Sequence, residues 1–302
     1  EIAELLDLYT KYNRRRTPEL LDNHTYSLIH YREFEKVVED YNRLAQKAKS
    51  LYDIIDEDQK DAFYQLVYFP VTICANLNEM YLYLAKNKQY AKEKRAATNS
   101  MADKVVELFK RDSLLTLEFH TELADGKWNH MMAQQHIGYT YWNQPDSNTM
   151  PQVTYLKVPE VGQLCIKIEG KDKIWTKHDS TANLSNFDNI NQQEFYFEIF
   201  NTGKRAIGYK IEAPEWLKIS ETENNLKEED RHFVSVNWDQ LPVGNSAGTI
   251  SVSGNGQVIE LGVIADKISS SAMGESSPMV ENTTRENRAQ NRRIEAELIK
   301  IK

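Results

Sequence analysis

The chain has 302 residues, of which 40% are hydrophobic and 27% are charged, and its formal net charge at pH 7 is −8. This length and composition indicate a globular protein of about two domains, each with its own core. The acidic balance argues against nucleic acid as a partner, because phosphate binding depends on clustered Lys and Arg. Membrane insertion is not expected either, since no apolar run approaches the length of a membrane span.

The first part of the chain shows the apolar spacing of amphipathic helices, with intervals of three and four residues. Helices are predicted at residues 2–9, 37–55, 63–84, 97–112 and 114–123. Arg14, Arg15 and Arg16 are expected to end the first helix, where cations oppose the negative end of the helix dipole. Short connections at residues 56–58 and 87–88 favour antiparallel packing, so we expect a bundle of about five helices.

Pro70 lies inside the third of these patterns, directly after Phe69. Proline removes a helical hydrogen bond and crowds the preceding turn. The apolar stripe nevertheless continues from Val71 to Leu84 on the same face. We therefore predict one kinked helix rather than two separate helices.

The second part of the chain changes to the period of β-strands. Alternating runs occur at residues 164–168, 195–199, 233–236, 249–252 and 258–264. Turn residues separate them, and Gly254-Asn255-Gly256 suits a tight hairpin. Several short strands with such turns predict an antiparallel, immunoglobulin-like β-sandwich.

The expected protein is therefore an α+β multidomain chain. Its predicted parts are a helical bundle at 1–125, an aromatic interdomain segment at 126–152, a β-sandwich at 153–266 and a tail at 267–302. The tail begins as a Ser-rich linker and becomes charged, with helical spacing at Ile294, Leu298 and Ile301. Cys74 and Cys165 fall in different predicted domains, which favours buried free thiols over a disulfide.

The interdomain segment concentrates large side chains where Gly138 and the cluster Asn143 to Asp146 break any helical period. The candidate substrate-rim or domain-interface residues are Trp128, His130, His136, Tyr139, Tyr141 and Trp142. Their flat faces could stack on sugar rings. The alternative is a wedge between domains, in which Trp128, Met131, Met132 and Ile137 cover the end of the bundle while Tyr139 to Trp142 packs on the sandwich. Trp216 and Trp238 are expected in the sandwich core.

Common catalytic motifs are absent from the sequence, including the P-loop, GxSxG, HExxH and CxxC. Glu118 and Glu122 lie four apart on one predicted helix face, and we interpret them as a solvated surface rather than an acid–base pair. The spacings between His120, His130 and His136 do not place metal ligands on one helical face. We therefore expect no catalytic residue, no metal and no cofactor in this chain.

Two segments resemble glycoside hydrolase family 115, the xylan α-glucuronidases. They are YQLVYFPVTICANLNEMYLYLAKN at 64–87 and DGKWNHMMAQQHIGYTYWNQPDSNTMPQV at 125–153. FYFEIFNTGKRAIGYKIEAPEWLKIS at 195–220 and HFVSVNWDQLPVGNSAGTISVSG at 232–254 are similar to the carboxyl-terminal β-domain of that family. The resemblance runs from about Tyr12 to about Ala265.

The resemblance implies an amino-terminal α/β domain and a (β/α)8 barrel upstream, with the catalytic acid in the barrel. The parent enzyme would remove glucuronic acid, or its 4-O-methyl ether, from glucuronoxylan by inverting hydrolysis. This chain alone would be inactive. It would support the barrel, contribute to a homodimer and bring an aromatic loop to the active-site rim.

The partners implied are the upstream domains and glucuronoxylan-derived oligosaccharides. A periplasmic or extracellular location would follow, with a signal peptide upstream of Glu1. Two alternatives stay open at the level of sequence. One is a stand-alone carbohydrate-binding or scaffolding protein, and the other is an unrelated structural protein whose bundle mediates assembly.

Overall fold

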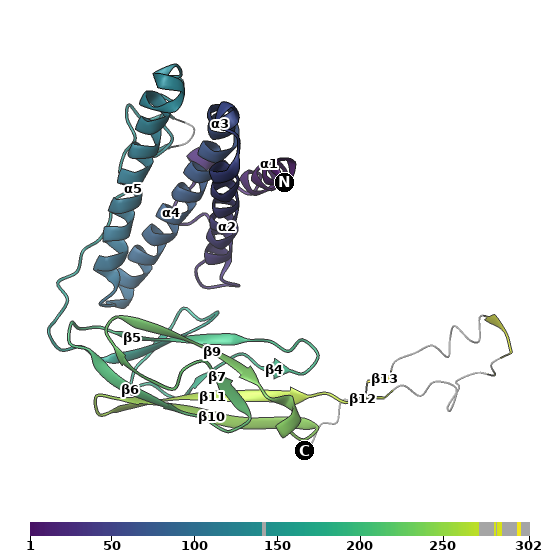
Figure 1. Cartoon of the computed structure of the whole chain (residues 1–302). Helices are drawn as coiled ribbons and strands as arrows, with labels where there is room; N and C mark the ends of the chain where they lie inside the picture. The colour runs from purple at the N-terminus through teal and green to yellow at the C-terminus, as the bar shows by residue number, and fades with distance from the viewer. Residues whose placement is uncertain (141–142, 272–280, 282, 286–294, 297–302) are drawn as a thin grey trace. The chain divides into compact units, whose positions relative to one another are not determined.

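The computed structural model describes residues 1–140, 143–271, 281, 283–285 and 295–296. The chain divides into two compact units, a helical unit at 1–160 and a β unit at 161–302. The predicted α+β class, with helices first and an antiparallel sandwich second, is confirmed (Figure 1). None of the helices in the described part of the chain combines the length and apolar character needed to cross a membrane.

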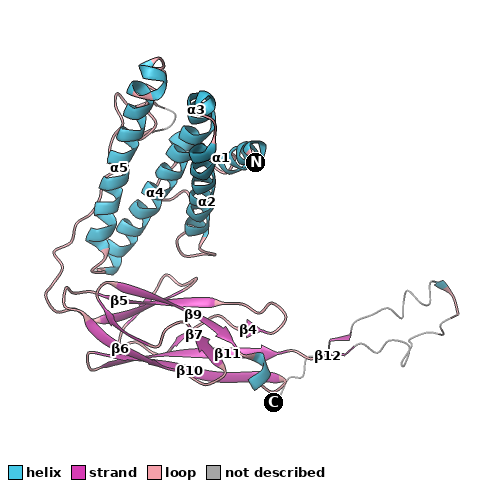
Figure 2. Ribbon diagram, viewed as in Figure 1, coloured by secondary structure: helices cyan, strands magenta, loops and turns pink. Residues whose placement is uncertain are grey.

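The helical unit is built from long helices that pack lengthwise, with the first helix lying across them (Figure 2). The helices are α1 (Ile2–Asn13), α2 (Glu33–Ile54), α3 (Glu57–Phe63), α4 (Phe69–Glu93) and α5 (Thr98–Thr121). Short helical turns η1 (Pro18–Leu20), η2 (Tyr64–Tyr68) and η3 (Leu123–Gly126) join or extend them. The first helix ends where the arginine run begins, as predicted, with Arg14 as its C-cap.

The predicted bundle of about five helices differs from the structure in where one helix ends and the next begins. Residues 97–112 and 114–123 were expected to form two helices, but α5 runs unbroken through Asp112. Asp112 is 1% exposed and bonds to a loop rather than ending the helix. The predicted turn at 87–88 is also wrong, because Asn87 is fully buried inside α4 and the turn follows at Lys94, a left-handed C-cap.

The prediction of a continuous helix through Pro70, rather than two separate helices, is confirmed, because α3, η2 and α4 follow one another without a break. A π-helical turn at Tyr64–Tyr68 precedes Pro70. Proline has no N–H to donate to the carbonyl of Leu66, and its ring crowds that group. The backbone N–H of Phe69 instead bonds to the carbonyl of Tyr64, five residues back, which widens the turn ahead of Pro70.

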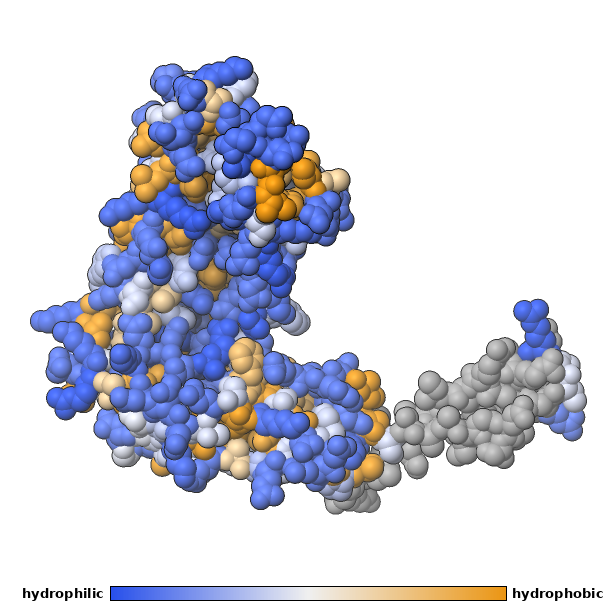
Figure 3. Space-filling model, viewed as in Figure 1, coloured by the Kyte–Doolittle hydropathy of each residue, from blue (hydrophilic) through white to orange (hydrophobic). Residues whose placement is uncertain are grey.

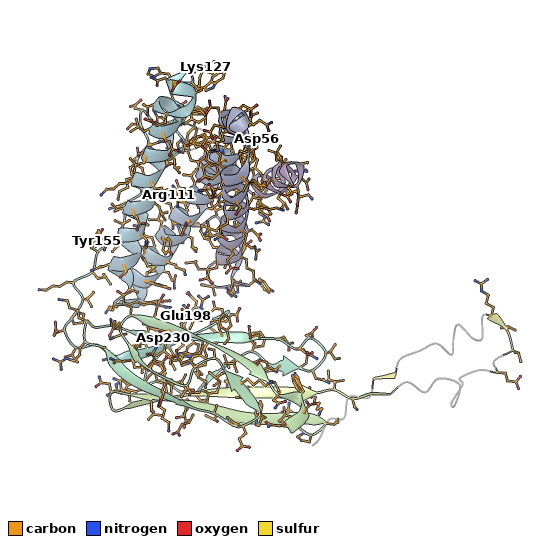
Figure 4. All side chains as sticks on the ribbon, viewed as in Figure 1. Asp56, Arg111, Lys127, Tyr155, Glu198 and Asp230 are labelled. Atoms are coloured by element: carbon orange, nitrogen blue, oxygen red, sulfur yellow. The ribbon has the colours of Figure 1, made fainter. Side chains whose placement is uncertain are left out.

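An extended segment at 153–156 lies along the helical unit and is held by two asparagine side chains. Asn87 accepts from the backbone N of Thr154 and donates to its carbonyl, both at 2.8 Å. Asn99 does the same for Leu156, at 2.8 and 3.1 Å. The Tyr155 hydroxyl donates to Asp103 at 2.9 Å, and its position beside α5 is visible in Figure 4. The two amides thus act like a short β-ladder with a period of two residues.

The β unit is a sandwich of two sheets. One sheet has the order β2-β1-β5-β9-β7, with β1 (Leu164–Ile168), β2 (Ile174–Trp175), β5 (Phe195–Asn201), β7 (Leu217–Ile219) and β9 (Glu229–Val236). The other has the order β3-β11-β10-β6-β8, with β4 also beside β11. Its strands are β3 (Ala182–Asn183), β4 (Phe187–Asp188), β6 (Ile207–Glu212), β8 (Glu223–Leu226), β10 (Gly244–Gly254) and β11 (Gln257–Lys267). Pairing is antiparallel except for β3 and β4, which run parallel to β11.

Alternating burial explains how the sandwich forms, since β6 and much of β11 bury every second residue. The predicted hairpin is confirmed: Asn255 and Gly256 join β10 to β11 with φ of 50° and 68°, the left-handed conformation of a two-residue turn. Trp216 and Trp238 are partly buried and pack against the sandwich core. Cys74 and Cys165 are buried and form no disulfide, as predicted.

In the tail, short strands β12 (Ser270–Ser271) and β13 (Glu295–Ala296) pair with each other. The predicted helical spacing at residues 294, 298 and 301 lies outside the described residues. At the other end of the chain, hydrophobic side chains gather over α1 (Figure 3), where Ile2 and Leu6 are 42% and 39% exposed.

Candidate functional site

The loop that follows α5 begins with an abrupt change of direction. Ala124, Asp125 and Gly126 all have left-handed backbone, with φ of 49°, 54° and 77°. Two such residues other than glycine cost roughly 1–2 kcal/mol each, so packing must offset them. Leu123, which is 5% exposed, packs in an aromatic cluster with Phe119 and supplies such packing.

His136 fixes this loop to α5 through the buried Asp112. The imidazole Nε2 lies 2.9 and 3.0 Å from the two carboxylate oxygens, and Nδ1 lies 3.3 Å from the carbonyl of Gln134. A carbonyl oxygen only accepts, so Nδ1 must carry a proton, and the carboxylate accepts from Nε2. Burial opposes the charge on this ring, but the hydrogen bond and the negative charge of Asp112 outweigh it and raise the pKa of His136. The ring is therefore an imidazolium.

Asn148 closes the same loop by binding backbone groups. Its Oδ1 accepts from the N–H of His136 at 2.8 Å and of Ile137 at 3.0 Å. Its own N–H donates to the side chain of Gln135 at 3.1 Å. Ile137 has no exposed surface and belongs to the core cluster formed by α2, α4 and α5. The loop is thus held by both polar and apolar contacts.

The loop closes one side of a pocket in the helical unit with a volume of about 250 Å³. Tyr9, Pro18 and Glu19 line it from α1 and η1, and Thr116 lines it from α5. Apolar wall residues come from α4 and the loop and include Phe69, Pro70, Ile73, Leu77, Met131 and Met132. Gln134 and His136 complete the loop side. The pocket is small and mostly apolar, with a few polar groups, as ligand sites commonly are.

Some polar atoms of the residues that line this pocket have hydrogen-bond partners, and others have none. Oε2 of Glu19 and Oγ1 of Thr116 are both buried, and neither finds a hydrogen-bond partner within the described residues. Such orphaned atoms are rare in folded proteins and call for an explanation. The charge of Glu19 also contributes to the raised pKa of His136.

Cys74 lines the pocket beside Tyr9, with its sulfur 3.9 Å from the phenol oxygen. Burial raises the pKa of the Cys74 thiol to about 11. Burial likewise raises the pKa of Tyr9. Both groups therefore stay protonated at neutral pH, so the thiol is a poor nucleophile.

The structure places the sequence candidates in different surroundings. Trp128 is half-buried against the aromatic cluster, with the Lys127 ammonium 5.0 Å from its ring centre; Figure 4 labels Lys127 just beyond the end of α5. His130 is exposed, with a left-handed φ of 68°. The Tyr139 hydroxyl accepts from the side chain of Gln134 at 3.0 Å. Tyr141 and Trp142 lie outside the described residues, and with them the prediction that Tyr139 to Trp142 packs on the sandwich.

Among the candidates that the structure describes, His136 is the one that lines the pocket, together with Glu19 and Thr116, and its ring binds Asp112. The sequence singled out none of these three partners. A carboxylate and a histidine 24 residues apart carry no local pattern, so the pairing has no signal in a single sequence. In the wedge interpretation, Ile137 covers the bundle as expected, while Met131 is 66% exposed.

The other titratable side chains of this region do not gather at one common site. Glu118 and Glu122 are exposed, in agreement with a solvated face. The ring of His120 lies 6.2 Å from that of His130, and its Nε2 accepts from the backbone N–H of Met132 at 3.3 Å. Across the described residues, no group of three or more His, Cys, Asp or Glu side chains is arranged to hold a metal ion.

The β unit holds a separate buried polar chain. The Tyr209 hydroxyl donates to Asp230 at 2.9 Å and lies 3.0 Å from Nε2 of His232. Because the hydroxyl proton goes to Asp230, Nε2 of His232 must donate to the phenol oxygen. Burial lowers the pKa of His232, so this ring is neutral at physiological pH. Figure 4 labels Asp230, on β9 beside Glu198 on β5.

No protein-family model matches the chain, and no curated protein matches it. Among solved structures, the chain is similar at 12% identity and a TM-score of 0.31 to a family GH115 4-O-methyl-α-glucuronidase, BtGH115A, with specificity for decorated arabinogalactans. That match covers 69% of this chain and 32% of the glucuronidase.

Two further matches concern smaller parts of the chain. The periplasmic chaperone SfaE is 13% identical, with a TM-score of 0.24, over 29% of this chain and 54% of the chaperone. A PapD-like domain of human CEP192 is 10% identical, with a TM-score of 0.26, over 41% of this chain and 98% of that domain. Similarities this distant carry no argument about fold or function.

Proposed function

We propose that this chain is the non-catalytic, carboxyl-terminal part of a xylan α-glucuronidase resembling glycoside hydrolase family 115. The parent enzyme would remove (4-O-methyl)glucuronic acid from glucuronoxylan by inverting hydrolysis. The observation that carries the proposal is the way in which the two most specific segments of the resemblance, 64–87 and 125–153, pack together. Ile137 of the second shares a core cluster with Leu77 and Met80 of the first, and both segments line the helical pocket.

A supporting role follows from the chemistry of the loop. Inverting hydrolysis requires one carboxylic acid and a second group that activates water on the opposite face of the sugar. The pocket offers a single carboxyl, Glu19, while Asp112 is taken by an imidazolium and the Cys74 thiol is protonated. We assign the catalytic groups to domains upstream of this chain.

The rigid mounting of the loop suits it to the rim of such an active site. His136 holds the loop to α5, and Asn148 binds the loop backbone at His136. Tyr139 lies between these two anchors and is half-buried, whereas His130 precedes them and is exposed. A fixed side chain contributes more to orienting a sugar than a mobile one, since less freedom is lost on binding. A periplasmic or extracellular location belongs to the same proposal, because polymeric xylan lies outside the cell.

The test compares this chain with the complete polypeptide that its reading frame encodes, using release of glucuronic acid from aldouronic oligosaccharides. We expect release by the complete polypeptide and none by this chain. In the complete polypeptide, His130→Ala should lower kcat/KM by roughly two- to ten-fold, because one aromatic contact with the sugar would be lost. Leu114→Ala, which changes an exposed residue of α5, serves as the control.

Hydrolysis by this chain alone would overturn the proposal. Tight binding of glucuronoxylan oligosaccharides by this chain, combined with a reading frame that lacks a barrel, would instead favour a stand-alone carbohydrate-binding protein.

A further inference from the structure

The pocket of the helical unit has a composition that the proposed function does not use. Its volume of about 250 Å³ corresponds to roughly eight water molecules at about 30 Å³ each. This is room for one small organic molecule. Its walls are hydrocarbon, thioether and aromatic surface, while its polar groups are concentrated on Glu19, Thr116, Gln134 and His136.

The charge of the pocket is set by Glu19. The positive charge of His136 is already matched by Asp112, which binds the ring with both carboxylate oxygens. Glu19 enters no ion pair with any described residue, and its Oε2 is buried without a partner. The pocket therefore presents one net negative charge, carried by the Glu19 carboxylate.

This pattern selects among ligand classes. An anion would be repelled by Glu19. A divalent metal ion would require several oxygen, nitrogen or thiolate ligands, whereas the pocket has a single carboxylate, its imidazole is already bound to Asp112, and burial keeps its thiol protonated. A sugar would leave most of its hydroxyl groups against apolar walls, which is unfavourable. An ammonium group, by contrast, supplies donors to the Glu19 carboxylate, and the rings of Tyr9 and Phe69 favour a nearby cation.

We propose that this pocket is a binding site for a small organic ammonium ion with an apolar body, with Glu19 as its counter-ion. The ammonium donates to the Glu19 carboxylate, and the hydrocarbon part packs on Phe69, Ile73 and Leu77. Met131 and Met132 are 66% and 38% exposed and lie on the loop side of the pocket. Their flexible side chains can adjust to ligands of different shape. This site is independent of the glucuronidase proposal, because it requires no upstream domain.

The experiment is a calorimetric titration of the whole chain with three probes of one shape, namely cyclohexylammonium, cyclohexanol and cyclohexanecarboxylate. We expect cyclohexylammonium to bind most tightly and the carboxylate least tightly. Glu19→Gln keeps the shape of the side chain and should weaken binding of cyclohexylammonium by at least about ten-fold, because a charge-assisted hydrogen bond is lost. Glu118→Gln removes an exposed carboxyl from the same unit and should leave the affinity unchanged.

A second readout is independent of calorimetry. Binding should neutralise the field of Glu19 at His136 and shift the imidazole NMR signals of His136, while those of His178, in the β unit, stay in place. The proposal is overturned if cyclohexanol binds as tightly as cyclohexylammonium, if Glu19→Gln leaves the affinity unchanged, or if no probe binds a folded chain.

Discussion

The pair formed by Asp112 and His136 makes the stability of the helical unit depend on pH in a defined direction. The pKa of His136 is raised in the folded state, whereas a histidine in an unfolded chain has a pKa of about 6.5. Stabilisation from the pair is therefore complete below about pH 6.5 and is lost as the pH rises through the folded pKa. The side chains are 16% and 1% exposed, so solvent screens the pair only weakly.

Asp112→Asn removes the charge and keeps the shape. Loss of a hydrogen bond between charged groups costs about 1.5–3 kcal/mol. Releasing the proton of His136 at about pH 5.5, one unit below its unfolded pKa, adds about 1.4 kcal/mol. We therefore expect the variant to lose about 3–4 kcal/mol of unfolding free energy at about pH 5.5, and only about 1–2 kcal/mol at about pH 8.

Urea unfolding followed by far-ultraviolet circular dichroism, which is dominated by the helices, measures both values. Asp7→Asn is the control, because its ion pair with Lys11 is exposed and should contribute less than about 1 kcal/mol at either pH. A difference between wild type and Asp112→Asn that stays constant from acid to alkaline pH would refute the assignment of an imidazolium. So would a difference that grows with pH.

Further substitutions test other parts of the structure. Asn87→Ala should destabilise the helical unit by about 2–4 kcal/mol, because buried backbone groups lose their partners, and amide exchange in the extended segment 153–156 should accelerate. Gly203→Ala should cost at least about 1–3 kcal/mol in the β unit, since the new Cβ would overlap a facing backbone, whereas Gly208→Ala meets open space and should be tolerated; thermal melts compare the two. Glu19→Gln should raise the melting temperature of the ligand-free chain, because a carboxylate with one buried, unpartnered oxygen is replaced by a neutral amide; a lower value would contradict the role given to this residue. The lowered pKa of His232 predicts that the β unit loses stability as the pH falls below about 6.5, measurable by tryptophan fluorescence in urea.

The elements that the sequence predicted well are those whose signal is periodic and local. The strand at 164–168, the continuation of the helix through Pro70 and the hairpin at Asn255 each follow from spacing or from the chemistry of one or two residues. The helix end expected near Asp112 was wrong, because α5 continues through this residue. A charged residue inside an apolar stripe suggests a helix end, and the sequence does not show that Asp112 is bound by His136. The turn expected at Asn87 was wrong for the same reason, since its partners lie 11 and 67 residues away.

The candidate site shows the same limit. The loop at 126–152 is conspicuous for its composition, and His136 was among its candidates, yet the groups that define the pocket come from α1, η1, α4 and α5. The sequence around Glu19, which follows a proline, gives no sign of a binding site. Glu19 stands out only in the structure, because its Oε2 is buried and has no hydrogen-bond partner within the described residues. An absent contact leaves no pattern in a sequence.

The protonation states of His136 and His232 have opposite consequences for the two units. His136 is held as an imidazolium by Asp112, while His232 is held neutral by burial beside Tyr209. The helical unit should therefore weaken as the pH rises above neutrality, and the β unit should weaken as it falls. If unfolding of the two units is followed separately, their midpoints should move in opposite directions across this range. A shared direction would mean that at least one of the two protonation states, and the hydrogen-bond directions derived from it, is wrong.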